Sequence, residues 1–166
     1  MTLKNTAADA KHQRDVYFMK KAIQLAKRGE SLGEVPVGAI VVDKAGKILA
    51  RATNLREQKK TVLGHAELVA VHRACQKHKS WRLTDCTLYV TLEPCFMCAG
   101  ALVQSRLSRV VFGARDPKGG ALGSLIDLSK HKKLNHHFEV EAGICQQECS
   151  ELLTTFFKKK RASSNS

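Results

Sequence analysis

Aromatic residues are scarce in this chain of 166 residues: one Trp, two Tyr and six Phe make up 5% of it. Sheets that bind single-stranded RNA stack the bases on aromatic side chains, so this scarcity argues against such a platform. Acidic residues are also few, since 15 Asp and Glu stand against 28 Lys and Arg, for a net charge of +13. An excess of this size favours a polyanionic partner, although a basic surface can also serve solubility alone.

Long apolar runs are absent as well. No stretch approaches the ~18 apolar residues that a membrane span needs, and the first fifteen residues are polar and charged. We therefore expect no signal peptide and no membrane partner. Six cysteines without a secretory signal indicate reduced thiols and a cytoplasmic protein. The length suits one domain with its own core.

One part of the sequence has the chemistry of a metal site. A His-Ala-Glu tripeptide, which begins at His65, is followed further on by Pro-Cys-Phe-Met-Cys, which ends at Cys98. One histidine and two thiolates hold Zn²⁺ at roughly 2.0–2.3 Å, and a catalytic zinc keeps its fourth position for water. His65, Cys95 and Cys98 are therefore the predicted ligands. Glu67 is left as an acid/base, placed where a proton must be moved.

The spacing predicts that two helix N-termini meet at the metal. Cys95 and Cys98 are one helical turn apart, so both sulfurs can face one point. His65 and Glu67 are two residues apart, and on a regular helix they would point about 200° away from each other. We therefore expect His65 at the mouth of its helix, before regular geometry begins. Gly64 would allow an abrupt turn into that helix.

Other interpretations of the CxxC pair remain open. Such a pair can be redox-active, or it can be half of a structural zinc site with four protein ligands. Cys145 and Cys149 would supply the other two ligands in principle, but their segment predicts an amphipathic helix. Packing is the simpler explanation for both, as it is for Cys75 and Cys86 in their apolar contexts. The upstream His-Ala-Glu favours the catalytic interpretation.

Hydrophobic periodicity predicts strands that alternate with helices. We expect helices over residues 15–28, 66–78 and 145–160, another from Pro94 onward and a short one from Ser124 to Ser129, with strands over 37–42, 47–53, 87–91, 109–112 and 138–141. This order predicts a three-layer α/β/α sandwich with a central five-stranded mixed sheet. Residues 14–161 would form a single domain, between a flexible leader at 1–13 and a disordered tail at 162–166.

Ligands in such sheets bind beyond the carboxyl ends of the strands. The third expected strand ends where it delivers Glu93 and Cys95. The pattern therefore predicts that the metal site lies at this edge of the sheet.

The H-x-E…P-C-x-x-C pattern is the signature of zinc nucleobase deaminases. Further segments extend the match: EVPVGA at 34–39, Asn54, TLYVTLEPC at 87–95, MCAGA at 97–101, VVFGARD at 110–116, GSL at 123–125 and NH at 135–136. With them the chain resembles the bacterial tRNA-specific adenosine deaminases, of the cytidine deaminase-like superfamily, from its first helix to Phe157. The loop at 113–124 and the basic C-terminal helix point to the tRNA branch.

The resemblance implies a zinc deaminase domain with one Zn²⁺ per subunit, in a homodimer whose partner is a tRNA anticodon stem-loop. The implied reaction converts the wobble adenosine of the anticodon to inosine. Zinc-bound hydroxide would attack C6 of adenine. Glu67 would carry protons from the water to N1 and then to the departing amino group.

The resemblance also implies substrate contacts. Asn54 would hydrogen-bond the target nucleoside, the backbone of Ala66 would contact its base, and Val35 and Pro36 would form an apolar wall. Two simpler explanations stay open: Asn54 as a turn residue after a strand, and Val35 and Pro36 as packing where a strand begins.

Two more sets of polar residues are implied as contacts. Arg115 and Asp116 lie in the loop that the resemblance places at the mouth of the site. Asp116 would accept a hydrogen bond from a ribose 2′-hydroxyl, the group that separates RNA from DNA, or it caps a turn before Pro117. The last helix closes on a basic run that either contacts nucleic acid or forms a solvated face: Lys158, Lys159, Lys160 and Arg161.

Two rival functions use the same motifs. Deamination of a free base or nucleoside, such as cytosine or guanine, would need no basic surface. An RNA-binding module that uses zinc only to hold its fold, and that catalyses no reaction, would give Glu67 no role.

Overall fold

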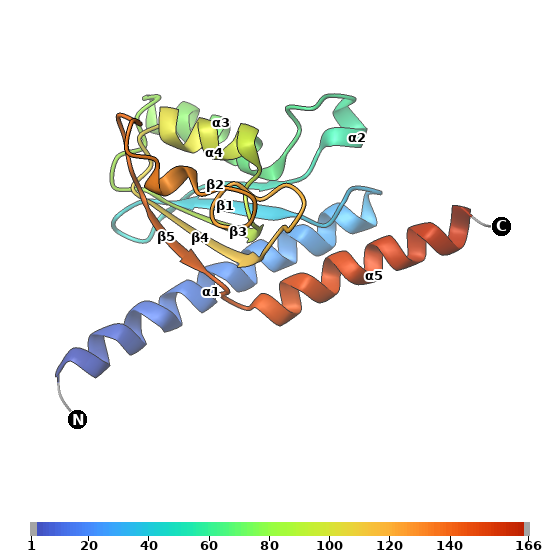
Figure 1. Ribbon diagram of the computed structural model, residues 1–166, viewed down its shortest axis with the longest axis horizontal. Coiled ribbons are helices and arrows are strands. Elements are labelled where there is room, and N and C mark those ends of the chain that lie inside the picture. The colour runs from blue at the N-terminus through green and yellow to red at the C-terminus, as the bar shows by residue number, and fades with distance from the viewer. Residues whose placement is uncertain (1–2, 165–166) are drawn as a thin grey trace.

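The computed structural model describes residues 3–164, and Figure 1 shows its elements. The helices are α1 (Leu3–Ser31), α2 (Arg56–Lys59), α3 (Ala66–His78), α4 (Phe96–Gln104) and α5 (Gln146–Ser164), with a 3-10 helix η1 (Leu128–Lys130). The strands are β1 (Gly38–Val42), β2 (Ile48–Thr53), β3 (Thr87–Leu92), β4 (Arg109–Ala114) and β5 (Glu139–Ala142).

The strands form one mixed sheet in the order β2-β1-β3-β4-β5. β1 is antiparallel to both β2 and β3, whereas β3, β4 and β5 are parallel to one another. Helices α1 and α5 cover one face of the sheet, and α3 and α4 cover the other (Figure 1). The predicted three-layer sandwich with a five-stranded mixed sheet is therefore confirmed. Since β3 and β4 are parallel, their carboxyl ends meet at one edge, where Leu92 pairs with Ala114.

The core lies on both faces of the sheet, which explains why β1 is an unbroken apolar run that is buried throughout. On the α3–α4 side, Ala70 and Leu102 pack with strand residues such as Val41. On the α1–α5 side, Met19 and Cys149 pack with the alternate strand residues. Successive strand residues point to opposite faces, so each strand serves both layers.

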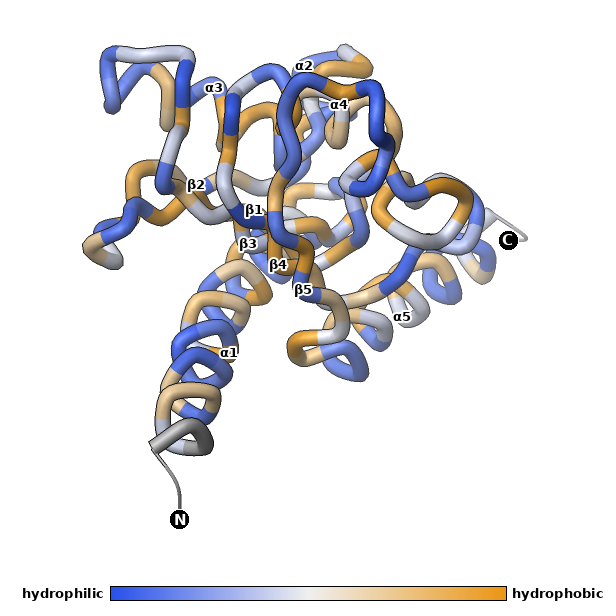
Figure 2. The backbone as a smooth tube through the Cα atoms, turned by 60° about the vertical axis from the view of Figure 1, so that its left-hand side comes forward, coloured by the Kyte–Doolittle hydropathy of each residue, from blue (hydrophilic) through white to orange (hydrophobic). Residues whose placement is uncertain are grey.

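Helix α1 begins earlier than the sequence predicted. It starts at Leu3 rather than near Asp15, so the expected flexible leader is wrong for residues 3–13; residues 1–2 lie outside the described residues. Figure 2 shows this part of α1 running away from the sheet. Its side chains from Thr6 to Arg14 are exposed, so no apolar stripe marks it in the sequence. Its alanines and lysines are good helix formers, and a helix already packed at one end propagates readily.

Helix α5 continues to Ser164, so the tail predicted at 162–166 is helical in its described part. The Ser163 hydroxyl donates to the carbonyl oxygens of Lys159 and Lys160 in the preceding turn. Residues 165–166 lie outside the described range.

The short helix predicted from Ser124 is also wrong. The 3-10 helix η1 begins at Leu128, and the Asp127 carboxylate caps it by accepting from the backbone N–H of Ser129 at 3.1 Å. Ser124 does not cap it, because its hydroxyl donates to the carboxylate of Glu93.

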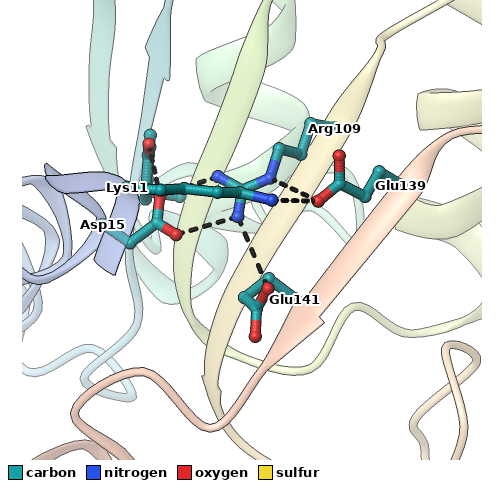
Figure 3. Close-up of polar contacts among 6 residues, drawn as sticks. Lys11, Asp15, Arg109, Glu139 and Glu141 are labelled. Carbon is teal, nitrogen blue, oxygen red and sulfur yellow. Dashed lines mark hydrogen bonds and ion pairs between the residues drawn. The ribbon is translucent and has the colours of Figure 1, made fainter. Parts of the chain in front are cut away.

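A nearly buried ion pair ties α1 to the sheet (Figure 3). The Arg109 guanidinium, on β4, donates two parallel hydrogen bonds to Asp15 on α1, at 2.7 and 2.8 Å. The Tyr89 hydroxyl, on β3, donates to the same carboxylate at 2.9 Å. Arg109 also pairs with Glu139 of β5, which Lys11 of α1 reaches from the other side. Burial would raise the pKa of Asp15, but the hydrogen bonds from Arg109 and Tyr89 outweigh it and hold the pKa below its usual value.

Candidate active site

Two helix N-termini converge at the edge of the sheet, as the spacing predicted. His65 is the N-cap of α3 and Cys95 is the N-cap of α4, and both have extended backbones (ψ of 139° and 176°). His65 therefore lies just before the first regular turn of α3. Its Nδ1 lies 3.6 Å from Cys95 Sγ and 3.5 Å from Cys98 Sγ.

These three side chains fit a tetrahedral metal ion. Bonds of roughly 2.0 Å to nitrogen and 2.3 Å to sulfur place those atoms about 3.5 Å apart around a tetrahedral centre. The ligand atoms of His65, Cys95 and Cys98 all lie within 4.8 Å of one another. Over residues 3–164 no other group of His, Cys, Asp or Glu meets this criterion.

The cysteines downstream do not complete a structural site. Cys149 is buried in the other layer, where a Cβ at Gly113 would lie 2.3 Å from its sulfur. Burial raises the pKa of Cys149 to about 12, so it stays a thiol. The interpretation as a four-cysteine zinc site is therefore wrong, and Cys149 is a packing residue.

The side chains of His65, Cys95 and Cys98 are linked by hydrogen bonds that change one another's pKa. Hydrogen bonds from Cys98 and then from His65 lower the pKa of Cys95 to about 3, against the effect of burial. The hydrogen bond with Cys95, together with burial, raises the pKa of Cys98. The hydrogen bond with Cys95 also raises the pKa of His65. Thiolates are the form that binds a metal, so metal binding would displace the shared protons.

Glu67 lies in the first turn of α3, beside the ligands but outside their group. It is 4% exposed, and burial raises its pKa to about 7. A carboxyl group with a pKa near neutrality can both accept and donate a proton at physiological pH. A buried carboxyl group therefore lies next to the three-residue group that could hold a metal.

A pocket of about 210 Å³ opens onto these residues. Of the predicted site residues it is lined by His65, Glu67, Cys95, Val35, Asn54, Ala66 and Asp116. Cys98 is buried behind the pocket. Pro36 is buried but does not line the pocket, and the neighbouring Val37 lines it instead.

The side-chain oxygen of Asn54, a residue of the pocket lining, has no partner within the protein. It is 7% exposed, and its Oδ1 finds no hydrogen-bond donor anywhere in the described part of the chain. Its backbone N–H donates to Val37 at 3.1 Å, which fixes the residue at the end of β2. Asn54 lines the pocket, and its buried, unpaired amide oxygen lacks the donor that such a group usually has.

The loop that carries α2 is shaped by a buried acid. The Glu34 carboxylate, which is fully buried, accepts from the backbone N–H groups of Glu57 and Gln58 at 3.2 and 2.8 Å. Gly64 closes the loop against Arg56, whose backbone nitrogen would lie 2.7 Å from a Cβ at Gly64. Gly64 is therefore needed for close approach, and the loop presents Arg56 to the pocket.

Asp116 carries the hydrogen bonds of a turn. Its Oδ1 accepts from the backbone N–H groups of Lys118 and Gly119, both at 3.1 Å, as the turn interpretation predicts. Asp116 also lines the pocket, so contact with a ribose stays a prediction.

A basic groove of about 740 Å³ adjoins the pocket and shares four lining residues with it: Val35, Leu92, Asp116 and Phe157. Its cationic lining is Arg115, Lys118 and Arg161. Arg115 lies here rather than in the pocket, above the ring of Phe112.

The basic run on α5 is divided. Arg161 faces the groove beside Phe157, whereas Lys159 pairs with Glu30 at 3.3 Å. Lys160 lies over the ring of Phe156 and lines a separate depression with Lys159. Of this run, only Arg161 is among the residues that line the groove.

The sequence did not single out four residues of the pocket, Val37, Arg56, Leu92 and Phe157, and it placed Glu93 at this edge of the sheet without assigning it a role. The carboxyl ends of the strands held the signal for Leu92 and Glu93, because ligands bind beyond them. Phe157 comes from a helix whose angle to the sheet no local pattern fixes.

None of the helices in the described range has both the length and the apolar composition of a membrane span.

Comparisons with known proteins agree with this geometry. The family model of the MafB19-like deaminases matches residues 13–161. The tRNA-specific adenosine deaminase of Bacillus subtilis is 50% identical over 147 residues, which are 89% of this chain and 91% of that protein. That of Haemophilus influenzae is 44% identical over 93% of this chain and 90% of its own length. A solved tRNA:A34 deaminase, which edits A to I at the wobble position of tRNA, superposes with a TM-score of 0.79 at 37% identity, over 82% of this chain and 99% of that one.

Proposed function

This chain belongs to the tRNA-specific adenosine deaminases of the cytidine deaminase-like superfamily, and from that premise we propose that it converts adenosine to inosine at the wobble position of a tRNA anticodon. The observation that carries the proposal is Glu67, a buried carboxyl group that lies beside three potential metal ligands and lines a pocket. A site that only stapled the fold would need neither this acid nor the pocket.

The metal that we infer is one Zn²⁺ per subunit, held by His65, Cys95 and Cys98. Two sulfurs and one imidazole nitrogen are soft donors at distances that suit it. When bound, zinc supplies a Lewis acid that activates water.

Glu67 moves the protons of the reaction. It accepts a proton from the attacking water and delivers it to N1 of adenine, which makes C6 electrophilic. Once the water oxygen has bonded to C6, Glu67 takes the remaining proton of that hydroxyl group and delivers it to the amino group, so that the C6–N bond breaks, ammonia leaves and C6 keeps the oxygen as a carbonyl. One carboxyl group serves both steps because it lies beside both the metal ligands and the pocket.

The pocket residues hold the flipped nucleoside. The unpaired Oδ1 of Asn54 would accept a hydrogen bond from it, which satisfies the buried oxygen. The backbone of Ala66 would contact the base, and Val35 and Val37 would form the apolar wall. A wobble base is single-stranded and leaves its stack at low cost.

Arg115, Lys118 and Arg161 would receive the phosphates of the flanking nucleotides, since they line the groove that continues from the pocket. Lys158, Lys159 and Lys160 would add to the electrostatic attraction of the anticodon stem-loop, as would the net charge of +13.

We also propose that the enzyme acts as a cytoplasmic homodimer. Large exposed apolar side chains flank both ligand helices: Leu63 is 61% exposed just before His65, and Phe96 is 49% exposed just after Cys95. A second copy of the chain would bury them. Sedimentation at micromolar concentration should give twice the monomer mass, and a Phe96→Glu variant should sediment as a monomer.

A comparison of substrates tests the proposal. The zinc-loaded protein is incubated separately with an anticodon stem-loop that carries adenosine at the wobble position, with adenosine, with cytidine and with guanine. We expect inosine from the stem-loop and little or no product from the others. Turnover of a free base or nucleoside alone would support the rival metabolic function. Tight stem-loop binding without any product would support an RNA-binding module.

A further inference from the structure

Glu93 is a second buried carboxyl group at the pocket, and the proposed chemistry leaves it without a role. It follows the last residue of β3 and precedes Cys95 by two residues. Its exposure is 1%, yet it lines the pocket. A buried carboxylate must be paired or fully hydrogen-bonded, so its partners reveal what it does.

All the groups that approach this carboxylate are donors. Oε1 accepts from the backbone N–H groups of Leu122 and Ser124, at 3.1 and 3.0 Å. Oε2 accepts from the backbone N–H of Asp116, at 3.0 Å, and from the Ser124 hydroxyl. A carboxylate offers about four acceptor positions and no donor, so it matches this set. An amide in its place would turn its NH₂ group toward two of the donors.

The loop from Asp116 to Ser124 is built around the carboxylate. A Cβ at Gly120 would lie 2.3 Å from the carboxyl carbon of Glu93, so only glycine fits there. Ala121 donates to the carbonyl oxygen of Pro94 at 2.9 Å, and Gly120 pairs with Cys95 in an isolated β-bridge. Converging backbone N–H groups form an anion-binding concavity, which a side chain of the protein itself fills here.

This loop presents the residues that face the substrate strand. Asp116 lines the pocket, and Lys118 lines the basic groove next to it. Both lie within a few residues of the N–H groups that Glu93 holds. Without the carboxylate, the three inward N–H groups would lose their shared acceptor, and the loop would lose its fixed place at the mouth of the pocket.

We propose that Glu93 is a positioning residue for the RNA strand: its carboxylate holds the loop at 116–124 in the conformation that receives the nucleotides next to the target adenosine. This role rests on the proposed function. The hydrogen bonds from the loop occupy the acceptor positions of the carboxylate, so Glu93 has none left for the substrate. Its loss should therefore weaken strand binding while the chemistry at Glu67 continues.

The test is Glu93→Gln, which keeps the shape of the side chain and removes two acceptor positions. For an anticodon stem-loop we expect KM to rise about tenfold, which corresponds to about 1.4 kcal/mol of binding, while kcat stays within about threefold and zinc content is unchanged. Hydrogen exchange should accelerate at the amides of Asp116, Leu122 and Ser124. Glu34→Gln is the matched control: it also alters a buried carboxylate that binds backbone N–H groups, but it should leave exchange in 116–124 unchanged.

Ser124→Ala is the milder variant, since it removes only the hydroxyl donor. It should shift KM and loop exchange in the same direction by a smaller factor, and it tests the role even if Glu93→Gln folds poorly. A fall in kcat at constant KM, or loop exchange that neither variant changes, would overturn the proposal. If the wild type does not deaminate the stem-loop but loop exchange responds as expected, the proposed function fails while the role of Glu93 in holding the loop stands.

Discussion

At the scale of single residues, neighbours in the sequence take different roles because a helix start separates their directions. His65 occupies the N-cap position of α3, and its side chain lies next to the two sulfurs. Glu67 lies in the first turn of the helix and lines the pocket. The ligand group therefore does not depend on Glu67 for a donor atom.

Replacing Glu67 with alanine should keep the metal and abolish turnover. Since acid–base catalysis contributes typically about 10²–10⁴-fold, we expect a rate loss of at least about 10³-fold in single-turnover assays, with one zinc per chain in both proteins. Cys95→Ala is the contrasting variant, because loss of a ligand should lower metal occupancy and stability together. Loss of zinc from the Glu67 variant would contradict its assignment as an acid/base.

Asp116→Asn separates the two roles left to this residue. Asparagine keeps the turn, because its side-chain oxygen can still accept from Lys118 and Gly119. If Asp116 also reads the ribose, removal of its charge should raise activity on a DNA copy of the anticodon loop relative to the RNA. An RNA-to-DNA ratio equal to that of the wild type would show that Asp116 only shapes the turn.

At the scale of elements, α1 is fixed to the sheet by polar contacts as well as by its apolar face. Asp15 and Arg109 are nearly buried and joined by two hydrogen bonds, and Arg109 keeps Glu139 and Glu141 as further partners. Tyr89 depends on the same carboxylate.

Asp15→Asn should lower the free energy of unfolding by about 1.5–3 kcal/mol at pH 7, the usual worth of hydrogen bonds to a charged group, because Arg109 keeps Glu139 and Glu141 as partners. The pKa of Asp15 in the folded state lies below the unfolded value of about 3.9. The contribution of the Asp15 carboxylate to the free energy of unfolding is therefore fully present above the unfolded-state pKa. It is lost as the pH falls through the folded-state pKa. Denaturant melts of both proteins from pH 7 to pH 3 should show the difference narrowing only at the acid end. A difference that grows toward low pH would contradict this assignment.

Within α5, the basic residues should contribute unequally to RNA binding. Arg161 lines the groove, whereas Lys160 lies over Phe156 at a separate depression. Arg161→Ala should raise the Kd for an anticodon stem-loop several-fold more than Lys160→Ala, with zinc content unchanged in both. Equal effects of the two substitutions would show that α5 acts only through its overall charge.

The sequence predicted an element where nearby residues mark it, and failed where the element depends on residues far away in the chain. The strands and the two ligand helices were predictable, because buried runs and the two metal motifs mark them directly. The start of α1 was not, because its exposed side chains carry no apolar period. Ser124 was assigned to a helix cap because its partner, Glu93, is distant in the sequence. Arg56 and Phe157 reach the pocket through loop and helix placement, which no spacing encodes.

At the scale of the whole molecule, charge should govern encounter with the substrate. With a net charge of +13, contacts between Lys or Arg and phosphates release counterions, so the logarithm of the affinity falls linearly with that of salt concentration. The Kd for tRNA should rise at least about tenfold between 50 and 200 mM salt. A Kd that does not change with salt would contradict an electrostatic mode of binding.

The enzyme that we propose deaminates one adenosine of an anticodon, with the buried Glu67 beside three metal ligands as its acid/base. The most direct measurement is to treat tRNA that carries an unmodified wobble adenosine with the zinc-loaded protein and to map inosine along the whole molecule by sequencing. We expect inosine at the wobble position alone, formed by the wild type and not by the Glu67→Ala variant with its zinc intact. Inosine at other positions to a similar extent, or equal editing by the variant, would contradict it.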